Sequence, residues 1–337
     1  MNVPFQSAAI LGAGLMGRLL AVTLAQAGCK VSLFEAGSPE AEGAAARVAA
    51  AMLAPLAESA VAPVSVVRMG HYALSRWPEL LAPLAQPVFF QREGTLVLWH
   101  RQDATEAARL ARVLARTGTQ VPELPPMQTL DGAGIAALEP SLGQRFAQGL
   151  FLPGEGQLDN RALLGSLLAT LQASPNVKLR WQSPRAPADF SPGTPGQPDW
   201  VIDCRGFGAR PQWNALRGVR GEVIRVHAPE VTLERPTRLV HPRYPLYIAP
   251  KPGNLFVIGA TEIESDDMSP ASVRSTLPDN LPAIRQPQPR VLQINGLYRH
   301  GFMIAPALLD AAMELLAHGH CALARSFGME TTTTDDA

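Results

Sequence analysis

Apolar and polar positions near the start of the chain follow the order strand, helix, strand. Ala8–Leu11 is a short apolar run, which suits a buried parallel strand. Leu15–Ala27 is apolar along most of its length and is followed by Gly28, a residue that commonly ends helices. Val31–Glu35 predicts a second strand. This order predicts a βαβ unit and therefore a parallel sheet.

The same patterns extend along the rest of the chain. Ser183–Pro198 is rich in Pro, Gly and Ser and predicts a turn-filled loop, and residues 330–337 predict a disordered tail. Asp159 is placed to cap the helix that follows it. The predicted helices are Arg47–Leu56 as far as Pro55, Val64–Leu74, Ala104–Thr117, Asn160–Gln172 and Ala305–Leu316. The predicted strands lie in Phe89–Trp99, Trp200–Cys204, Glu222–Val226, Leu246–Ala249, Leu255–Ile258 and Val291–Asn295.

Composition narrows the class of protein. The 337 residues are 47% hydrophobic and 17% charged, which allows a sizeable core. The formal net charge is zero, so no long-range field favours nucleic acid as a partner. Cys29, Cys204 and Cys321 form no CxxC pair, so we expect neither a disulfide framework nor a metal site. This cysteine usage fits a reducing compartment, and we expect a cytoplasmic protein.

No segment predicts a membrane span. Residues 43–67 are apolar in count, but Arg47, Pro55, Glu58 and Pro63 interrupt them. The N-terminal apolar run leads directly into a glycine motif and therefore predicts a first strand, not a signal peptide. The sequence leaves the oligomeric state open, including a homo-oligomer.

Three glycines follow the first strand at the spacing of a dinucleotide-binding turn. Gly12 permits the tight turn, Gly14 lets the backbone approach a pyrophosphate, and Gly17 lets the helix pack closely on the strand. Leu15 and Met16 begin the helix, whose free N–H groups and positive dipole end favour phosphate.

An acid ends the second strand, where it can accept hydrogen bonds from both ribose hydroxyls. This acid is Glu35, followed by Ala36 in the same cofactor loop. A carboxylate would repel the 2′-phosphate of NADP. The motif is compatible with either FAD or NAD, and does not choose between them.

Further segments carry patterns that distinguish an FAD-binding protein from an NAD-binding one. They occur in this order: Ala49–Pro55, Val201–Arg210, Val219–Val223, Leu246–Lys251 with Val257–Thr261, and Asn295–Pro306. Together with the glycine motif they resemble the D-amino-acid-oxidase superfamily, and most of all the glycine oxidases of bacterial thiamine biosynthesis. That family usually has a glycine where this chain has Ala51.

The resemblance implies an α/β fold with FAD as cofactor. It implies a Rossmann-like FAD-binding domain with a central parallel sheet, into which a substrate domain with a largely antiparallel sheet is inserted. The FAD-binding domain would comprise residues 1–85, 140–218 and 277–329, and the substrate domain residues 86–139 and 219–276.

The resemblance also implies the reaction. Glycine, or another small amino acid or amine, would lose a hydride from its α-carbon to the flavin. The imine would become an oxo acid and ammonia, and O₂ would take the electrons and become hydrogen peroxide. The cofactor carries this chemistry, while the protein supplies orientation and electrostatics.

The resemblance assigns roles to residues near the flavin. Arg299 would contact the substrate carboxylate and Tyr247 would lie over the active site, although a surface or ion-pairing arginine and a half-buried strand tyrosine are the plainer interpretations. A helix that starts near Met303 would direct its dipole at the flavin edge where negative charge develops. The other cofactor contacts would be Ala50, Ala51, Met52, His300, Gly301 and Phe302. His241 and His300 receive no catalytic role.

One block of the family pattern is missing. The family has a helix, a strand and a Gly-x-Arg-Pro run whose arginine is the principal clamp on the substrate carboxylate. Here Ser269–Thr276 begins like a helix and runs directly into Leu277–Pro282, which resembles the segment after that arginine. Arg274 would belong to the helix start, so no residue takes the role of the clamp.

Three functions therefore stand as alternatives. The first is an FAD-dependent amino-acid oxidase of glycine-oxidase type. The second is a flavin-binding protein without oxidase turnover, because the clamp is missing. The third is an NAD-dependent dehydrogenase, against which the run from Arg299 to Pro306 argues.

Overall fold

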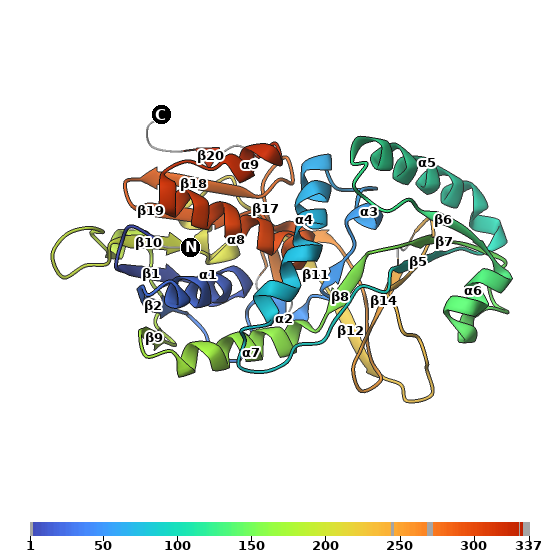
Figure 1. The fold of residues 1–337 in the computed structure, drawn as a ribbon, viewed down its shortest axis with the longest axis horizontal. Coiled ribbons are helices and arrows are strands. Elements are labelled where there is room, and N and C mark those ends of the chain that lie inside the picture. The colour runs from blue at the N-terminus through green and yellow to red at the C-terminus, as the bar shows by residue number, and fades with distance from the viewer. Residues whose placement is uncertain (1–2, 244–245, 268–271, 330, 333–337) are drawn as a thin grey trace.

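The fold is described from a computed structural model, which covers residues 3–243, 246–267, 272–329 and 331–332. Two seven-stranded sheets lie side by side along the long axis of the molecule, with helix α4 (Val64–Leu81) between them (Figure 1). Each sheet is built from segments that are far apart in the sequence.

The first sheet has the strand order β20-β18-β19-β10-β1-β2-β9. Its central strands run parallel, and Ile10 of β1 lies between Leu33 of β2 and Ile202 of β10. Only β18 runs antiparallel to its neighbour β19. The strands are β1 (Ser7–Leu11), β2 (Lys30–Phe34), β9 (Val177–Arg180), β10 (Trp200–Asp203), β18 (Ala283–Gln288), β19 (Val291–Asn295) and β20 (Thr331–Thr332).

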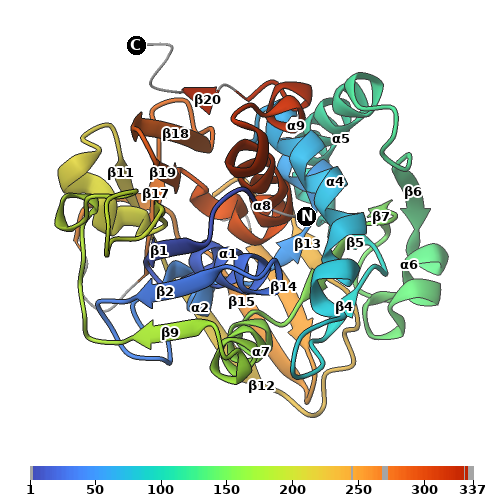
Figure 2. The same cartoon turned by 60° about the vertical axis from the view of Figure 1, so that its left-hand side comes forward.

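Helices α1 (Leu15–Gln26), α7 (Asn160–Ala173) and α8 (Gly301–His318) pack together with α4 over this sheet. Their apolar faces bury Leu20, Trp77 and Leu308 in one continuous core. Figure 2 shows α8 and α1 beside the strands that they cover. Burial on both faces explains why the strands read as continuous apolar runs.

The second sheet has the order β12-β15-β14-β13-β5-β7-β6 and is antiparallel except between β13 and β5. Helices α5 (Ala104–Gln120) and α6 (Gly132–Leu138) lie at its far end (Figure 1). The strands are β5 (Thr95–Leu98), β6 (Gln128–Asp131), β7 (Gln148–Leu152), β12 (Val223–His227), β13 (Thr237–Leu239), β14 (Leu246–Lys251) and β15 (Leu255–Gly259).

Two three-stranded sheets complete the fold, in the orders β3-β8-β4 and β16-β11-β17. Their strands are β3 (Met52–Leu53), β4 (Phe90–Gln91), β8 (Gly156–Leu158), β11 (Arg217–Gly221), β16 (Ile263–Glu264) and β17 (Ser272–Thr276). The short helices are α2 (Ala45–Val48), α3 (Pro55–Glu58) and α9 (Ala322–Ser326), with 3₁₀ turns at Arg101–Asp103, Pro140–Leu142, Pro187–Asp189, Gly206–Gln212 and Tyr298–His300.

The predicted fold class is confirmed: a mixed sheet with parallel central strands accompanies a separate, largely antiparallel sheet. The predicted cap is also present, since Asp159 Oδ1 accepts from the backbone N–H groups of Arg161 and Ala162. Helix α8 begins at Gly301, four residues before the predicted start at Ala305. The residue limits given to the two domains stay a prediction.

The predicted helix Arg47–Leu56 is wrong. Helix α2 ends at Val48, and the chain then turns through Ala51, whose φ is +52°. Strand β3 follows, paired with β8, before α3 begins at Pro55. One helix does not run through this stretch, because proline lacks an N–H and favours extended backbone in the residue before it.

The helix-like interpretation of Ser269–Thr276 is also wrong where the structure describes it. Residues 272–276 form β17, which pairs antiparallel with all of β11, while 269–271 lie outside the described residues. The partner strand decides the conformation, since β-branched and small residues fit a pleated surface. In the predicted disordered tail, Thr331–Thr332 form β20 beside β18, and residues 330 and 333–337 lie outside the described residues.

Among the residues that the structure describes, one helical stretch, Tyr298–His318, is long and apolar enough to cross a membrane, with a mean hydropathy of 1.3. In the fold, 78% of its apolar 18-residue window is buried. It packs against α4 and α1, so its apolar face is satisfied inside the protein.

Candidate active site

The glycine turn has the geometry that the sequence predicts. Gly12 adopts a φ of +92°, and a Cβ there would lie 2.8 Å from the Arg205 Cα. A Cβ on Gly17 would lie 1.8 Å from the Gly12 carbonyl oxygen, so only glycine lets α1 approach the end of β1 this closely. By contrast, a Cβ on Gly14 would have only the Ala44 Cβ within 4 Å, at 3.9 Å.

This opening lies at the N-terminus of α1, and the surrounding groups suit a phosphate. No side chain caps the helix and no acid occupies its first turn, where Leu15 and Met16 stand. The first N–H groups of a helix and its dipole both favour an anion. The residues present therefore fit a pyrophosphate at Gly14.

Glu35 stands at the carboxyl end of β2, next to the glycine turn. Its Oε2 accepts from the Ala13 N–H at 2.6 Å, and its Oε1 accepts from the Gly37 N–H at 2.9 Å. These bonds fix the carboxylate beside Ala36 while leaving acceptor capacity on both oxygens. The position suits a ribose diol.

The segment Ala50–Met52 joins the cofactor end to the second sheet. Ala51 is buried in the left-handed region, which explains why the resembling family has glycine there. The Ala51 carbonyl accepts from the Leu158 N–H at 3.1 Å, which holds this turn against β8. Ala50 packs with Ala249 and Val257 of the second sheet.

Helix α8 presents its N-terminus toward the region between the two sheets. Its first turn begins at Gly301 and contains no acid and no side-chain cap. Trp77 of α4 donates from Nε1 to the Phe302 carbonyl at 3.0 Å, and Met303 packs against Gly70 of α4. These contacts fix the direction of the helix dipole, as a negatively charged flavin edge would need.

Arg299 lies in the 3₁₀ turn just before α8 and is paired with two carboxylates. Its Nε lies 3.1 Å from Glu58 Oε2, and its Nη1 donates to Glu262 Oε2 at 2.8 Å. The pairing with Glu58, ahead of opposing burial, raises the pKa of Arg299. Arg299 is therefore a half-buried, ion-paired arginine, as one of the plainer interpretations expects, and its contact with a substrate stays a prediction.

Glu58 ends α3 and is the buried centre of this charged group. It pairs with Arg238 of β13 as well as Arg299, and its Oε2 lies 3.4 Å from His300 Nδ1. Burial by itself raises the pKa of Glu58, but these three neighbours outweigh burial and hold the pKa well below its usual value. Glu58 is therefore ionised at neutral pH.

Tyr247 and Arg274 complete the group, and each needs a glycine beside it. A Cβ on Gly259 would lie 2.6 Å from the Tyr247 hydroxyl, and one on Gly221 would lie 1.7 Å from Arg274 Nη2. Burial raises the pKa of Tyr247, so the hydroxyl stays protonated at neutral pH. Arg274 lies within electrostatic range of Tyr247, Arg299 and Glu262, although burial lowers its pKa.

The position of Arg274 corrects the expectation that it belongs to a helix start. It stands in β17, opposite Val219 of β11. The next residue, Ser275, donates from its hydroxyl to Asn295 Oδ1 at the end of β19, which ties β17 to the first sheet. The strand thus carries Arg274 to the same group as Arg299. Arg274 lies three positions before Leu277, where the segment expected after the clamp begins, and that order was the overlooked signal.

Sequence reasoning missed three other charged residues of this group. Glu58 follows Ala49–Pro55 by three positions, so that motif pointed close to it. Glu262 directly follows the Val257–Thr261 motif, whereas Arg238 lies in a segment without a pattern of its own. Only the packing of β13 and of the loop after β15 brings these two residues into the group. In the described part of the chain, no group of three or more His, Cys, Asp or Glu side chains is arranged to hold a metal.

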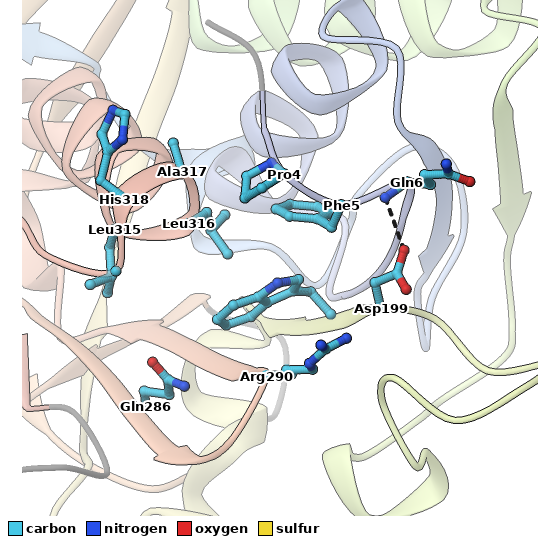
Figure 3. Close-up of a pocket in the computed structure, with 12 residues that line it drawn as sticks. Pro4, Phe5, Gln6, Asp199, Gln286, Arg290, Leu315, Leu316, Ala317 and His318 are labelled. Atoms are coloured by element: carbon cyan, nitrogen blue, oxygen red, sulfur yellow. Dashed lines mark hydrogen bonds between the residues drawn. The ribbon is translucent and has the colours of Figure 1, made fainter.

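A surface hollow of about 700 Å³ lies elsewhere, at the amino ends of β1 and β10. Phe5, Asp199, Arg290 and Leu316 line it, and Asp199 is engaged by the Gln6 N–H at 2.9 Å (Figure 3). Open α/β sheets bind ligands at the carboxyl ends of their strands, where Gly12 and Glu35 stand. The hollow therefore lies at the opposite strand ends from the cofactor site and is separate from it.

Comparison with known proteins agrees with this geometry. The family model described as DAO, FAD dependent oxidoreductase, matches residues 7–273. The chain belongs to this family. It is therefore an FAD-dependent oxidoreductase, which excludes the NAD-dependent alternative.

Individual relatives point the same way. A Rhizobium etli protein provisionally named thiamine biosynthesis oxidoreductase ThiO is 36% identical over 90% of this chain and 95% of its own length. Glycine oxidase from Geobacillus kaustophilus has the same fold, with a TM-score of 0.75, 21% identity, and coverage of 94% and 96% of the two chains. Iminodiacetate oxidase from Chelativorans sp. gives a TM-score of 0.77 at 19% identity, covering 96% and 99%.

Proposed function

We propose that this FAD-dependent oxidoreductase oxidises the amine of a small amino acid, with glycine as the representative substrate, in thiamine biosynthesis. The arginine pair Arg299 and Arg274, next to the N-terminus of α8, is the observation that carries the proposal. The name of the Rhizobium relative supports the pathway, and the fold shared with a glycine oxidase is consistent with the substrate class.

The charges of the group suit one substrate carboxylate. Arg238, Arg274 and Arg299 supply three positive charges, whereas Glu58 and Glu262 supply two negative ones, so 3 − 2 leaves one positive charge. Arginine binds a carboxylate through two parallel N–H donors. One carboxylate neutralises this group, whereas a dicarboxylate would leave a negative charge in a largely buried place.

Bound FAD would supply the acceptor for the hydride of the substrate α-carbon. Arg299 and Arg274 orient the substrate by its carboxylate, and the Tyr247 hydroxyl, protonated at neutral pH, donates a further hydrogen bond. The dipole of α8 stabilises negative charge at its N-terminus. No described side chain is assigned as a base, since an amine that arrives neutral needs none.

The cofactor contacts belong to the same proposal. Gly12, Gly14 and Gly17 would form the pyrophosphate turn with Leu15 and Met16. Glu35 and Ala36 would bind the ribose. The isoalloxazine would lie against two segments, one comprising Ala50, Ala51 and Met52 and the other His300, Gly301, Phe302 and Met303.

Molecular oxygen as the electron acceptor and a cytoplasmic location are further parts of the proposal. The alternative without turnover rested on the absence of a carboxylate clamp. Arg274 stands in β17, which packs against the turn that carries Arg299, and this place suits the role of the clamp. We therefore favour an active oxidase.

The test is peroxide release by the purified yellow protein. Glycine should give hydrogen peroxide and ammonia in equal amounts, and iminodiacetate should be a poorer substrate because of its second carboxylate. A protein that holds FAD but releases no peroxide with glycine or any other small amino acid would contradict the proposal.

A further inference from the structure

The guanidinium of Arg299 has no free fork for a substrate carboxylate in this structure. A guanidinium offers two edges that can each donate two parallel hydrogen bonds, one from Nε and Nη2 and one from Nη1 and Nη2. Glu58 is paired at Nε and Glu262 at Nη1, so each edge is engaged at one corner. A substrate that binds through both donors of one edge must displace one of these two glutamates.

The two glutamates differ in how easily they can leave. The Glu58 side chain is 9% exposed and is held by Arg238 and His300 as well as Arg299. Its removal would leave the largely buried Arg238 without its carboxylate partner, which is costly. The Glu262 side chain is 38% exposed and pairs with Arg299. Water can solvate the Glu262 carboxylate once it swings away.

Glu262 also stands where it can move without disturbing the core. It lies in the short segment between β15 and β16, and the Glu264 carboxylate two residues later pairs with Arg217 at 3.3 Å. Arg299 is exposed to only 22%, so the contact with Glu262 is stronger than an ordinary surface ion pair. The carboxylate thus competes directly for the site of a substrate.

We propose that Glu262 is an internal competitor for the substrate carboxylate on Arg299 and thereby sets the affinity and selectivity of the site. A ligand with one carboxylate takes over the Arg299 contact and sends Glu262 toward solvent. A ligand with a second negative charge meets the displaced Glu262 and is rejected. This inference rests on the proposed carboxylate-binding role of Arg299.

Acetate is the probe, because it carries the carboxylate without the amine. Isothermal titration calorimetry measures its Kd for the FAD-containing protein and for the variants Glu262→Gln and Glu262→Ala. Loss of the competing charge should lower the acetate Kd by about three- to tenfold. Glu264→Gln is the matched control, because it removes a charge two residues away, in β16, that pairs with Arg217 and not with Arg299, and it should leave the Kd unchanged.

Kinetics with glycine provide a second measurement. Glu262→Gln should lower KM by a similar factor and leave kcat unchanged, because Glu262 opposes ground-state and transition-state binding equally. It should also reduce the preference for glycine over iminodiacetate. A purely structural role for Glu262 would instead lower thermal stability and kcat together.

The outcomes separate this inference from the proposed function. An unchanged or weaker acetate affinity in both Glu262 variants, with wild-type binding intact, would overturn the role of Glu262 alone. Absence of acetate binding in every form would overturn the carboxylate site and this inference with it. Tighter acetate binding in Glu262→Gln without glycine turnover would support the competitor and contradict the oxidase.

Discussion

The groups that suit the FAD phosphate and ribose lie within one stretch, from Gly12 to Glu35, and are held by backbone geometry. The charged group around Arg299 is assembled from six separate segments, which carry Glu58, Arg238, Tyr247, Glu262, Arg274 and Arg299. A contiguous site is specified by local rules of turns and helix ends. A dispersed site depends on which strands become neighbours, and local rules do not determine strand pairing.

The largest expected effect tests the contiguous site. Gly14→Val should fold, because its Cβ would meet only Ala44 at 3.9 Å, but the side chain would fill the place of the pyrophosphate. The variant should purify soluble and colourless. Gly17→Val is the contrasting variant and should not fold, since its Cβ would lie 1.8 Å from the Gly12 carbonyl oxygen. Full flavin content in Gly14→Val, measured by absorbance, would show that the phosphate turn is misplaced.

The dispersed site should respond to the loss of either arginine. Arg299→Ala and Arg274→Ala should each keep FAD and weaken glycine binding by about ten- to a hundredfold, the cost of a hydrogen bond to a charged group. Arg299→Lys should recover little, because an ammonium lacks the planar fork. The double variant should have no measurable turnover. Unimpaired kcat/KM in Arg274→Ala would show that β17 carries no clamp.

The junction between the two regions should show a pH-dependent stability. Lys251 of β14 donates from Nζ to the Leu158 carbonyl at 2.8 Å and to Gln157 Oε1 at 3.1 Å. Burial lowers the pKa of Lys251 from 10.5 to about 7. The unfolded chain thus binds a proton more tightly, so stability rises with pH between about 7 and 10 and is lowest below that window.

Replacement of this lysine isolates the effect. Lys251→Met should remove the rise, which is on the order of a few kcal/mol across that window. Urea unfolding at several pH values measures it, as the difference between wild type and variant at each pH. Parallel curves for the two proteins would contradict the buried position of Lys251.

The smallest expected effect concerns Ala51. Its φ of +52° favours glycine, so Ala51→Gly should stabilise the protein by about 1 kcal/mol. Ala50→Gly is the control, since Ala50 is not at positive φ and the change should be destabilising. Thermal unfolding of the two variants compares them. If both glycine variants were less stable than the wild type, Ala51 would not adopt the left-handed conformation.

This comparison also explains what the sequence could predict. The glycine turn, the Asp159 cap and the βαβ order follow from rules that act within a few residues. The wrong predictions lie where strand pairing determines the secondary structure. Ser272–Thr276 has the local pattern of a helix start but forms β17, paired with β11. Arg274 was misjudged for that reason. Glu262 directly follows the Val257–Thr261 motif, but its pairing with Arg299 is a contact 37 positions away, which local rules do not predict.

The central claim is that the Arg299–Arg274 pair presents a small amino acid to FAD. Anaerobic mixing of the FAD-containing protein with glycine tests it most directly, with the visible flavin absorbance as the readout. The account predicts that the yellow colour bleaches with wild type, and at least tenfold more slowly with Arg274→Ala at the same subsaturating glycine concentration. Persistent yellow colour of the wild-type protein with glycine and with other small amino acids would contradict the account.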